Sequence, residues 1–337
     1  MKVAVCIPSY NEKENIQNIT RIIDEGLSKL DVEYSVIVNC DNNSPDGTNN
    51  LFNMTATKHK KISIVDSRKG KGVNLLNFFK YCQQNDIDYA FTFDSDLKSI
   101  NATWIEKYYE SLKKGNDFVL PLYKRNYQEG NTTNHFIGLV LYEKYGVFIR
   151  QPIGGDYGFN KKYINTILKN KFTSNILMYG IDIFMVVTAI YNDMNIDEVE
   201  LGHKVHKPSL SKMELIFESV LRGFSDVCRQ YPLRSDKRSL KYICYSYDKK
   251  ELITNTLIMK KYSNLCKLYN FNSYQEILDE WLKLLHEYLE NVDCPSDNLI
   301  KKMKEVFVCR AVSFWLQNQN NEKWEEQLLD EFYRRRI

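Results

Sequence analysis

The sequence predicts an α/β fold with a mainly parallel sheet flanked by helices, followed by an all-helical region. Three observations lead to this prediction. Short apolar runs alternate with amphipathic segments from residue 3 to residue 122, turn-forming residues follow several of the apolar runs, and helical periodicity dominates after about residue 209. Strands that alternate with helices in this way form βαβ units, whose strands run parallel.

The expected strands are short apolar runs rich in β-branched and aromatic side chains. They are Val3–Ile7, which Pro8 closes, and then Tyr34–Val38, Ile62–Val65, Tyr89–Phe93 and Phe118–Leu122. The segments between them carry apolar residues at helical spacing. These expected helices are residues 12–27, a segment from Thr48 onward, Val73–Cys82, and Ala102–Lys113 with Asn101 as its N-cap.

Later segments predict less regular structure and then helices. Residues 128–134 and 151–157 are expected to be loops, and residues 181–190 a helix. Ser273 and Glu276 have the spacing of a capping box, and Asp297 begins a second long helical pattern. We therefore expect two domains, an α/β domain at residues 1–215 and a helical domain at residues 216–337.

Composition limits the classes of protein to consider. A net charge of +3, with acids and bases interspersed, gives no reason to expect nucleic-acid binding. No apolar stretch is long enough to span a bilayer, and the first residues enter a strand pattern instead of a signal peptide. The basic cluster Arg334–Arg336 could make a weak contact with anionic lipid, although a solvated tail is the alternative.

The eight cysteines are scattered, without a C-x-x-C motif or a zinc-like spacing with histidine. Free thiols are typical of a reducing compartment, so we expect a cytoplasmic protein. The sequence does not set the oligomeric state, and a homodimer is compatible with it.

The run Tyr89-Ala-Phe-Thr-Phe leads into two carboxylates one residue apart, Asp94 and Asp96. At the C-terminal end of a buried strand, both would face the crevice where open α/β sheets bind ligands. Carboxylates held close together repel unless a cation lies between them. A hard divalent ion that also touches a diphosphate fits such a place. A strand end that runs into a solvated loop is the alternative.

Four motifs follow strand ends in a fixed order. They are Ile7-Pro-Ser-Tyr-Asn-Glu12, Asp41-Asn-Asn-Ser-Pro-Asp-Gly-Thr48, Gly70-Lys-Gly72 and Asp94-Ser-Asp96. In this order they resemble the motifs of the nucleotide-sugar-dependent glycosyltransferases of the GT-A fold, of the family 2 type. The resemblance implies a Rossmann-like GT-A domain, a nucleotide-diphosphate sugar as donor, and Mg²⁺ or Mn²⁺ as cofactor.

A second set of motifs narrows the resemblance. Gln151-Pro-Ile-Gly-Gly-Asp156, Tyr179-Gly-Ile-Asp182 and Leu201-Gly-His-Lys-Val-His206-Lys207 look like segments of the retaining enzymes that make glucosyl-3-phosphoglycerate and mannosylglycerate. The resemblance covers about residues 1–230. It implies that Asp96 and His206 contact the metal directly.

The resemblance also implies donor-binding residues. Asn42 stands where the family usually has a second aspartate that contacts the base, and its amide adds a hydrogen-bond donor. Simple packing of Tyr10 and a solvated Lys71 are the alternatives for two of these positions. The implied donor-binding residues are Pro8, Tyr10, Glu12, Asp41, Asn42, Lys71, Asp94, Gly154 and Gly155.

Three aspartates are the implied catalytic residues, namely Asp96, Asp156 and Asp182. Asp156 stands where the family commonly has glutamate, which puts its direct hydrogen bond to the sugar in doubt. Asp182 resembles the acid that contacts the donor sugar or the acceptor hydroxyl. An ordinary acid at a helix N-terminus is the alternative for Asp182.

The acceptor side departs from the family. The phosphoglycerate enzymes hold the acceptor phosphate with an arginine in a glycine-rich segment, and here Glu129-Gly-Asn-Thr-Thr-Asn-His135 contains none. Thr132, Thr133 and Asn134 could bind a carboxylate or hydroxyls instead, less strongly than a guanidinium group.

The implied reaction is metal-dependent transfer of a hexosyl group from a UDP- or GDP-sugar to a small hydroxyl acceptor such as glycerate or 3-phosphoglycerate, with retention of configuration. Asp182 acting as a base would give inversion instead. Two further alternatives stay open: a lipid-phosphate or surface-polysaccharide acceptor, and a nucleotide-sugar-binding module without turnover.

Overall fold

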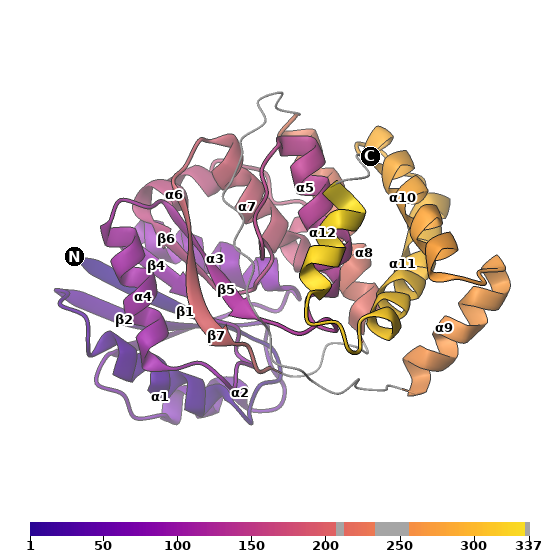
Figure 1. The fold of residues 1–337 in the computed structure, drawn as a ribbon. Coiled ribbons are helices and arrows are strands. Elements are labelled where there is room, and N and C mark those ends of the chain that lie inside the picture. Colours follow the sequence, from indigo (N-terminus) through magenta and orange to yellow (C-terminus); the bar gives the residue numbers. More distant parts are fainter. Residues whose placement is uncertain (207–211, 233–255, 334–337) are drawn as a thin grey trace. The chain divides into compact units, whose positions relative to one another are not determined.

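The computed structural model describes residues 1–206, 212–232 and 256–333 (Figure 1). The chain forms two compact units. The α/β unit consists of Met1–Tyr123 and Ile153–Lys207, and the helical unit of Lys124–Pro152 and Pro208–Ile337. The chain therefore leaves the α/β unit once and returns to it before it enters the remainder of the helical unit.

The α/β unit is built on a seven-stranded sheet in the order β3-β2-β1-β4-β6-β5-β7. Four strands are parallel neighbours, whereas β6 runs antiparallel to both β4 and β5. The predicted mainly parallel sheet is confirmed. The strands β6 and β7 were not predicted from the sequence. The strands are β1 (Lys2–Ser9), β2 (Tyr34–Asp41), β3 (Lys60–Val65), β4 (Tyr89–Thr92), β5 (Phe118–Lys124), β6 (Tyr157–Asn160) and β7 (Ile196–His203).

Helices cover both faces of this sheet. Val3, Val5 and Ile7 of β1 share one hydrophobic core with α1 and α4, and alternation along the strand turns Ala4 and Cys6 to the other face. The predicted N-cap of α4 is confirmed, because Asn101 Oδ1 accepts a hydrogen bond from Thr103 N at 3.0 Å. The helices of this unit are α1 (Ile16–Leu27), α2 (Thr48–Met54), α3 (Lys71–Gln84), α4 (Ala102–Lys113), α6 (Lys161–Ile167), η2 (Ile176–Gly180) and α7 (Ile181–Tyr191).

Two predicted boundaries around the first motif are wrong. β1 does not end at Pro8 but continues to Ser9, whose hydroxyl donates to Asn39 Oδ1 of β2 at 2.7 Å. The first helix begins at Ile16 instead of residue 12. The preceding turn places the Asn15 side chain to donate to the Ser95 carbonyl at 2.8 Å, so this turn holds the loop after β4.

The helical unit has a core rich in aromatic rings. Phe217 and Phe307 stack with their ring centroids 4.0 Å apart, and Trp281 Nε1 donates to the His135 carbonyl at 2.9 Å. The predicted helical region is confirmed. The loop predicted over 128–134 is wrong at its end, because a helix that starts at Thr133 joins this core. The elements are η1 (Thr133–Ile137), α5 (Gly138–Tyr145), α8 (Met213–Gln230), α9 (Thr256–Tyr269), α10 (Tyr274–Glu290), α11 (Asp297–Gln317) and α12 (Trp324–Tyr333).

Several predictions concern the whole chain. Lys207 and the basic cluster Arg334–Arg336 lie outside the described residues. In the parts of the chain that the structure describes, no helix combines the length and apolar character needed to cross a membrane. The seven cysteines in these parts are free thiols.

Candidate active site

The motifs meet at the carboxyl ends of β1, β2 and β4, which lie side by side as parallel neighbours. Lys71 at the start of α3, Asp182 at the start of α7 and the segment after β7 join them there. We call the group of acidic and basic side chains at this edge the charged cluster. It consists of Lys71, Asp94, Asp96, Asp156, Asp182 and Lys204.

Asp94 lies between two ammonium groups. Lys71 Nζ is 2.8 Å from its Oδ1, and Lys204 Nζ is 3.2 Å from its Oδ2. Burial alone would raise the pKa of Asp94, but the two lysines outweigh it and lower the pKa to about 2. Asp94 is therefore ionised at neutral pH and held by two cations of the chain itself.

Lys71 connects three segments. Besides Asp94, its Nζ lies 3.2 Å from Asp182 Oδ1 and donates to the Gly155 carbonyl at 3.0 Å. Burial opposes the charged form of Lys71, yet the carboxylates of Asp182 and Asp94 raise its pKa well above the ordinary value. For Asp182 the balance differs, since burial raises its pKa in spite of Lys71.

Two glycines allow this close approach of segments. A Cβ on Gly72 would lie 2.2 Å from the Ile176 carbonyl oxygen, so any side chain would push η2 away from α3. Gly155 has φ +98°, and a Cβ there would lie 2.3 Å from Asp94 Oδ2. Both positions therefore require glycine. Neighbouring Gly154 contributes its carbonyl oxygen, which accepts from Lys204 Nζ at 2.8 Å.

Asp156 does not face solvent. Its side chain is fully buried, with 0% exposure, and Oδ2 accepts from Lys204 Nζ at 2.8 Å and from the Tyr123 hydroxyl at 2.5 Å. Its Oδ1 accepts from the backbone N–H of Asp94 at 2.7 Å. With these three internal donors, the carboxylate fixes the start of the loop after β4, and a direct contact with the sugar stays a prediction.

Asp96 and His206 face each other across 3.9 Å, measured from Oδ2 to Nδ1. Both side chains are about a quarter exposed. Burial and the neighbouring Asp94 carboxylate raise the pKa of Asp96. Unlike at Asp94, burial and neighbouring negative charge outweigh the attraction of Lys204 and Lys71 at Asp96.

The residues present fit a divalent cation. Two donors, an oxygen and an imidazole nitrogen, converge from segments 110 positions apart in the chain (206 − 96), and this ligand set suits Mn²⁺ or Mg²⁺. Within the described ranges, no three His, Cys, Asp or Glu residues are grouped to hold a metal. A cation held by Asp96 and His206 would therefore take its other ligands from a bound molecule or water.

The predicted nucleoside residues lie along the same edge. Pro8 is buried at the end of β1 and Glu12 is partly buried. Tyr10 is 45% exposed, and Lys69 Nζ lies 4.0 Å from the centroid of its ring. An exposed ring at a strand end can stack on a flat ligand, and Lys69 is a neighbour that the sequence analysis did not single out.

Asp41 and Asn42 are buried in an internal network. The Asp41 carboxylate accepts from the hydroxyls of Ser9 at 2.9 Å and Ser44 at 2.8 Å. Asn42 Nδ2 donates to Asn74 Oδ1 at 2.7 Å. The amide donor expected to contact a base is therefore already used within the chain.

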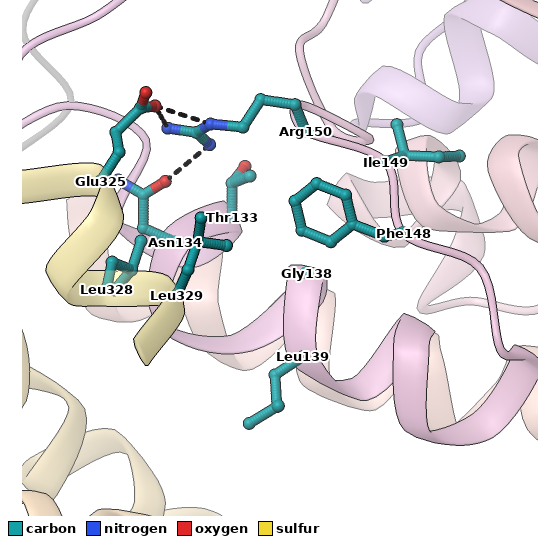
Figure 2. A pocket seen from close by; sticks show the side chains of 10 residues that line it. All are labelled: Thr133, Asn134, Gly138, Leu139, Phe148, Ile149, Arg150, Glu325, Leu328 and Leu329. Carbon is teal, nitrogen blue, oxygen red and sulfur yellow. Dashed lines mark hydrogen bonds and ion pairs between the residues drawn. The ribbon is translucent and has the colours of Figure 1, made fainter. Parts of the chain in front are cut away.

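The predicted acceptor residues belong to the helical unit. Thr132, Thr133 and Asn134 are all buried. Thr133 and Asn134 line a small hollow that is partly open to solvent (Figure 2). Asn134 Oδ1 accepts from Arg150 Nη1 at 3.1 Å, and Arg150 is also paired with Glu325 of α12.

Besides Lys69, sequence analysis missed two further basic residues. Arg150 comes from outside the glycine-rich segment, so its approach to Asn134 depends on folding. Lys204 lies in the matched segment Lys204-Val-His206, but a lysine is usually solvated, and only the structure shows its side chain 5% exposed. Its place two residues before the predicted metal ligand is the signal that could have found it.

Comparison with known proteins identifies the family of the chain. The family model described as glycosyl transferase family 2 matches residues 4–190, more than half of the 337-residue chain. A dolichol-phosphate mannosyltransferase of Pyrococcus furiosus is 26% identical over 193 residues, which are 53% of this chain and 51% of that protein. The chain thus spans about half the length of this relative.

Solved structures show the same fold. Glucosyl-3-phosphoglycerate synthase of Mycobacterium tuberculosis, in complex with Mn²⁺, UDP and glucosyl-3-phosphoglycerate, has a TM-score of 0.55 and 19% identity, covering 68% of this chain and 80% of that one. The same enzyme with Mg²⁺ and UDP has a TM-score of 0.53 and 19% identity, covering 68% and 79%.

At this identity the structures establish a GT-A-like fold and nothing beyond it, whereas the family model covers most of the α/β unit. The chain therefore belongs to glycosyl transferase family 2.

Proposed function

We propose that the protein transfers a hexosyl group from a UDP- or GDP-sugar to a small hydroxyl acceptor such as glycerate or 3-phosphoglycerate, with Mg²⁺ or Mn²⁺ as cofactor. One observation carries the proposal. Among the described residues of the charged cluster, four carboxylates outnumber two ammonium groups by two charges, and Asp96, one of the four, faces His206. This is the edge of the sheet where α/β folds bind ligands, and one divalent cation would balance it.

Asp96 and His206 would hold the cation. When bound, it would offset the negative charge that grows on the leaving diphosphate. Lys71, at the first turn of α3, would contribute a further positive charge toward the diphosphate. Because Lys71 now pairs with Asp94 and Asp182, binding of a diphosphate would compete with two carboxylates for its ammonium group.

Asp182 would orient the reacting hydroxyls. Its carboxylate is mostly buried and tied to Lys71, so it can accept hydrogen bonds from a donor-sugar or acceptor hydroxyl in a fixed direction. We propose retention of configuration, with the acceptor proton passing to the leaving diphosphate. Proton transfer to Asp182 would instead accompany inversion, and the anomeric form of the product, determined by NMR, separates the two.

The first test is a thermal-shift panel of UDP-, GDP- and ADP-sugars with and without Mn²⁺. A ligand that binds only the folded state stabilises it by mass action and so raises Tm. At a ligand concentration a hundredfold above Kd, the free energy of unfolding rises by about 2.7 kcal/mol. We expect one nucleotide to stabilise the protein in a Mn²⁺-dependent way, and Asp96→Ala to abolish the Mn²⁺ dependence. A chain that responds to no nucleotide would contradict the proposal, whereas a chain that binds a nucleotide sugar but releases no nucleoside diphosphate with any acceptor would be a binding module without turnover.

The acceptor is tested by nucleoside diphosphate release. With the donor found in the first test, we expect glycerate or 3-phosphoglycerate to increase the release rate above hydrolysis without acceptor. The support for small acceptors is the resemblance of the motifs and the fold shared with a phosphoglycerate enzyme. Equal release with and without these acids would exclude them as acceptors.

A second candidate acceptor is a lipid phosphate. It is favoured by the likeness to a dolichol-phosphate mannosyltransferase, which covers about half of each chain. Detergent-dispersed polyprenyl phosphate in the same release assay tests it. Stimulation by the lipid alone would assign this acceptor class in place of the small acids.

Location and assembly are further predictions. Free cysteines are compatible with the reducing cytoplasm, and cell fractionation tests that location. Light scattering on the purified protein tests the homodimer.

A further inference from the structure

The Lys204 side chain is almost completely buried at the centre of the α/β unit's charged residues. Its side chain is 5% exposed, and Nζ donates to the Gly154 carbonyl at 2.8 Å, to Asp156 Oδ2 at 2.8 Å and to Asp94 Oδ2 at 3.2 Å. The ammonium group also lies 5.2 Å from the centroid of the Tyr123 ring. Three acceptors match the three N–H donors of an ammonium group, so Lys204 is held in one place.

The residues that follow Lys204 are fixed to the loop after β4. Val205 N donates to Ser99 Oγ at 2.9 Å, and the Val205 carbonyl accepts from Lys98 N at 2.8 Å. His206 comes next in the chain and faces Asp96. The loop that carries Asp96 and the segment that carries His206 are thus joined by one buried ammonium group, one backbone hydrogen bond and one hydrogen bond from a backbone N–H to a side-chain hydroxyl.

We propose that Lys204 is a positioning residue for the metal site, which holds the His206 segment against the Asp94-Ser95-Asp96 loop and so sets the separation of Asp96 and His206. This inference rests on the proposed function, because it assigns Lys204 a role in the metal binding proposed there. Lys204 does not contact the cation itself. It acts through Asp94, Asp156 and the backbone on both sides of the site.

A lysine that only stabilises the fold would also make the contacts of Lys204 with Asp94, Asp156 and the Gly154 carbonyl. It would stabilise the fold by neutralising buried carboxylates, and its loss would lower Tm without a selective effect on the metal. The connection of Lys204 to both sides of the proposed site predicts more: the affinity for Mn²⁺ and the participation of His206 should change together. Mutation of residues that hold metal ligands in place without touching the metal typically weakens metal affinity by roughly 10–100-fold.

The test is titration of the full-length protein with Mn²⁺, once in the presence of UDP and once in the presence of GDP, with the free ion measured by electron paramagnetic resonance. We expect Lys204→Met to weaken Mn²⁺ binding by roughly 10–100-fold. Lys98→Met is the matched control, because it removes the same charge from an exposed side chain on the adjoining loop and should leave the affinity unchanged.

A second variant keeps the test valid if Lys204→Met does not fold. Ser99→Ala removes only the hydroxyl that accepts from Val205 N, and the loss of one such hydrogen bond should weaken Mn²⁺ binding by roughly 2–10-fold. Circular dichroism and Tm, measured without metal, show whether each variant is folded. A folded Ser99→Ala with the affinity of the wild type would count against the proposal.

The nitrogen signal of the bound Mn²⁺ separates positioning from stability. In the wild type, pulsed resonance should detect a ¹⁴N coupling that His206→Gln removes. We expect Lys204→Met to lose this coupling even at saturating Mn²⁺. A folded Lys204→Met that keeps both the Mn²⁺ affinity and the ¹⁴N coupling would overturn this inference but not the proposed function. A wild-type protein that binds no Mn²⁺ would overturn both.

Discussion

The two units bury charge in opposite ways. In the described part of the helical unit, two buried guanidinium groups pair with acids: Arg150 with Glu325, and Arg310, with 0% exposure, with Glu331. In the α/β unit, Lys71 and Lys204 face four carboxylates. The helical pairs are balanced by themselves, whereas the charged cluster lacks two positive charges.

This difference separates structural charges from functional ones. A buried pair that is balanced needs nothing further, and its removal mainly affects stability. A group of like charges that the fold holds together repels and therefore costs stability unless a cation joins it. The charged cluster thus has the character of a binding site, and variants in the two units should fail in different ways.

The largest expected effect is on turnover after Asp96→Asn. The amide keeps the size of the side chain but removes the charge beside His206, so the cation proposed to offset the diphosphate charge loses an anionic ligand. We expect kcat to fall by about 10²–10³-fold, as for other single groups that stabilise transition-state charge, with no decrease in Tm. Initial rates of nucleoside diphosphate release at saturating donor measure it, and a rate within threefold of the wild type would show that Asp96 has no such role.

The next effect is on stability in the helical unit. Glu331→Gln leaves the Arg310 guanidinium buried without its partner charge, and such a change costs about 3–5 kcal/mol of unfolding free energy. Urea denaturation should show the loss, while Mn²⁺ affinity in the presence of UDP stays that of the wild type.

A double variant checks the physical cause. Arg310→Leu combined with Glu331→Leu removes both buried charges and should recover most of the stability, because no unpaired charge is left. Equal losses in the single and double variants would mean that packing of these long side chains, and not their pairing, is what stabilises this part of the unit.

The parts of the fold that sequence predicts are those with local signals. The first five strands and α4 follow from apolar runs and from the Asn101 cap, which act over a few residues. β6 has only four residues, one of them glycine, and it is a strand because β4 and β5 offer hydrogen-bond partners on both sides. Such pairing is a tertiary effect that no local pattern contains.

Sequence patterns predict which residue types form the site, but they do not predict which side chains contact each other. The order of the motifs identifies Asp94, Asp96 and Lys71 as candidate site residues. It does not show that Asp94 is the aspartate paired with lysines and that Asp96 is the one that faces His206. Lys204 makes that distinction, and it lies 110 positions from Asp94 in the chain. The functional roles of all these side chains stay predictions until the variants are measured.

The smallest expected effect is the pH dependence of stability after Asp182→Asn. Burial raises the pKa of Asp182, so its ionised form costs stability in the folded protein above that pKa, and the cost disappears as pH falls below the unfolded value near ~3.9. The metal-free variant should therefore melt about 2–4 °C higher than the wild type at pH 7, and this difference should shrink toward pH 4.

Asp24→Asn is the control of opposite sign. Although burial opposes its charge, backbone N–H groups of Lys58 and His59 lower the pKa of Asp24, so its ionised form stabilises the fold above the unfolded value. This stability is lost as pH falls through the folded pKa, and the variant should melt lower than the wild type at pH 7. If both variants changed Tm in the same direction at pH 7, the charged cluster would not carry the electrostatic cost assigned to it, and the contrast between the units would rest on metal binding alone.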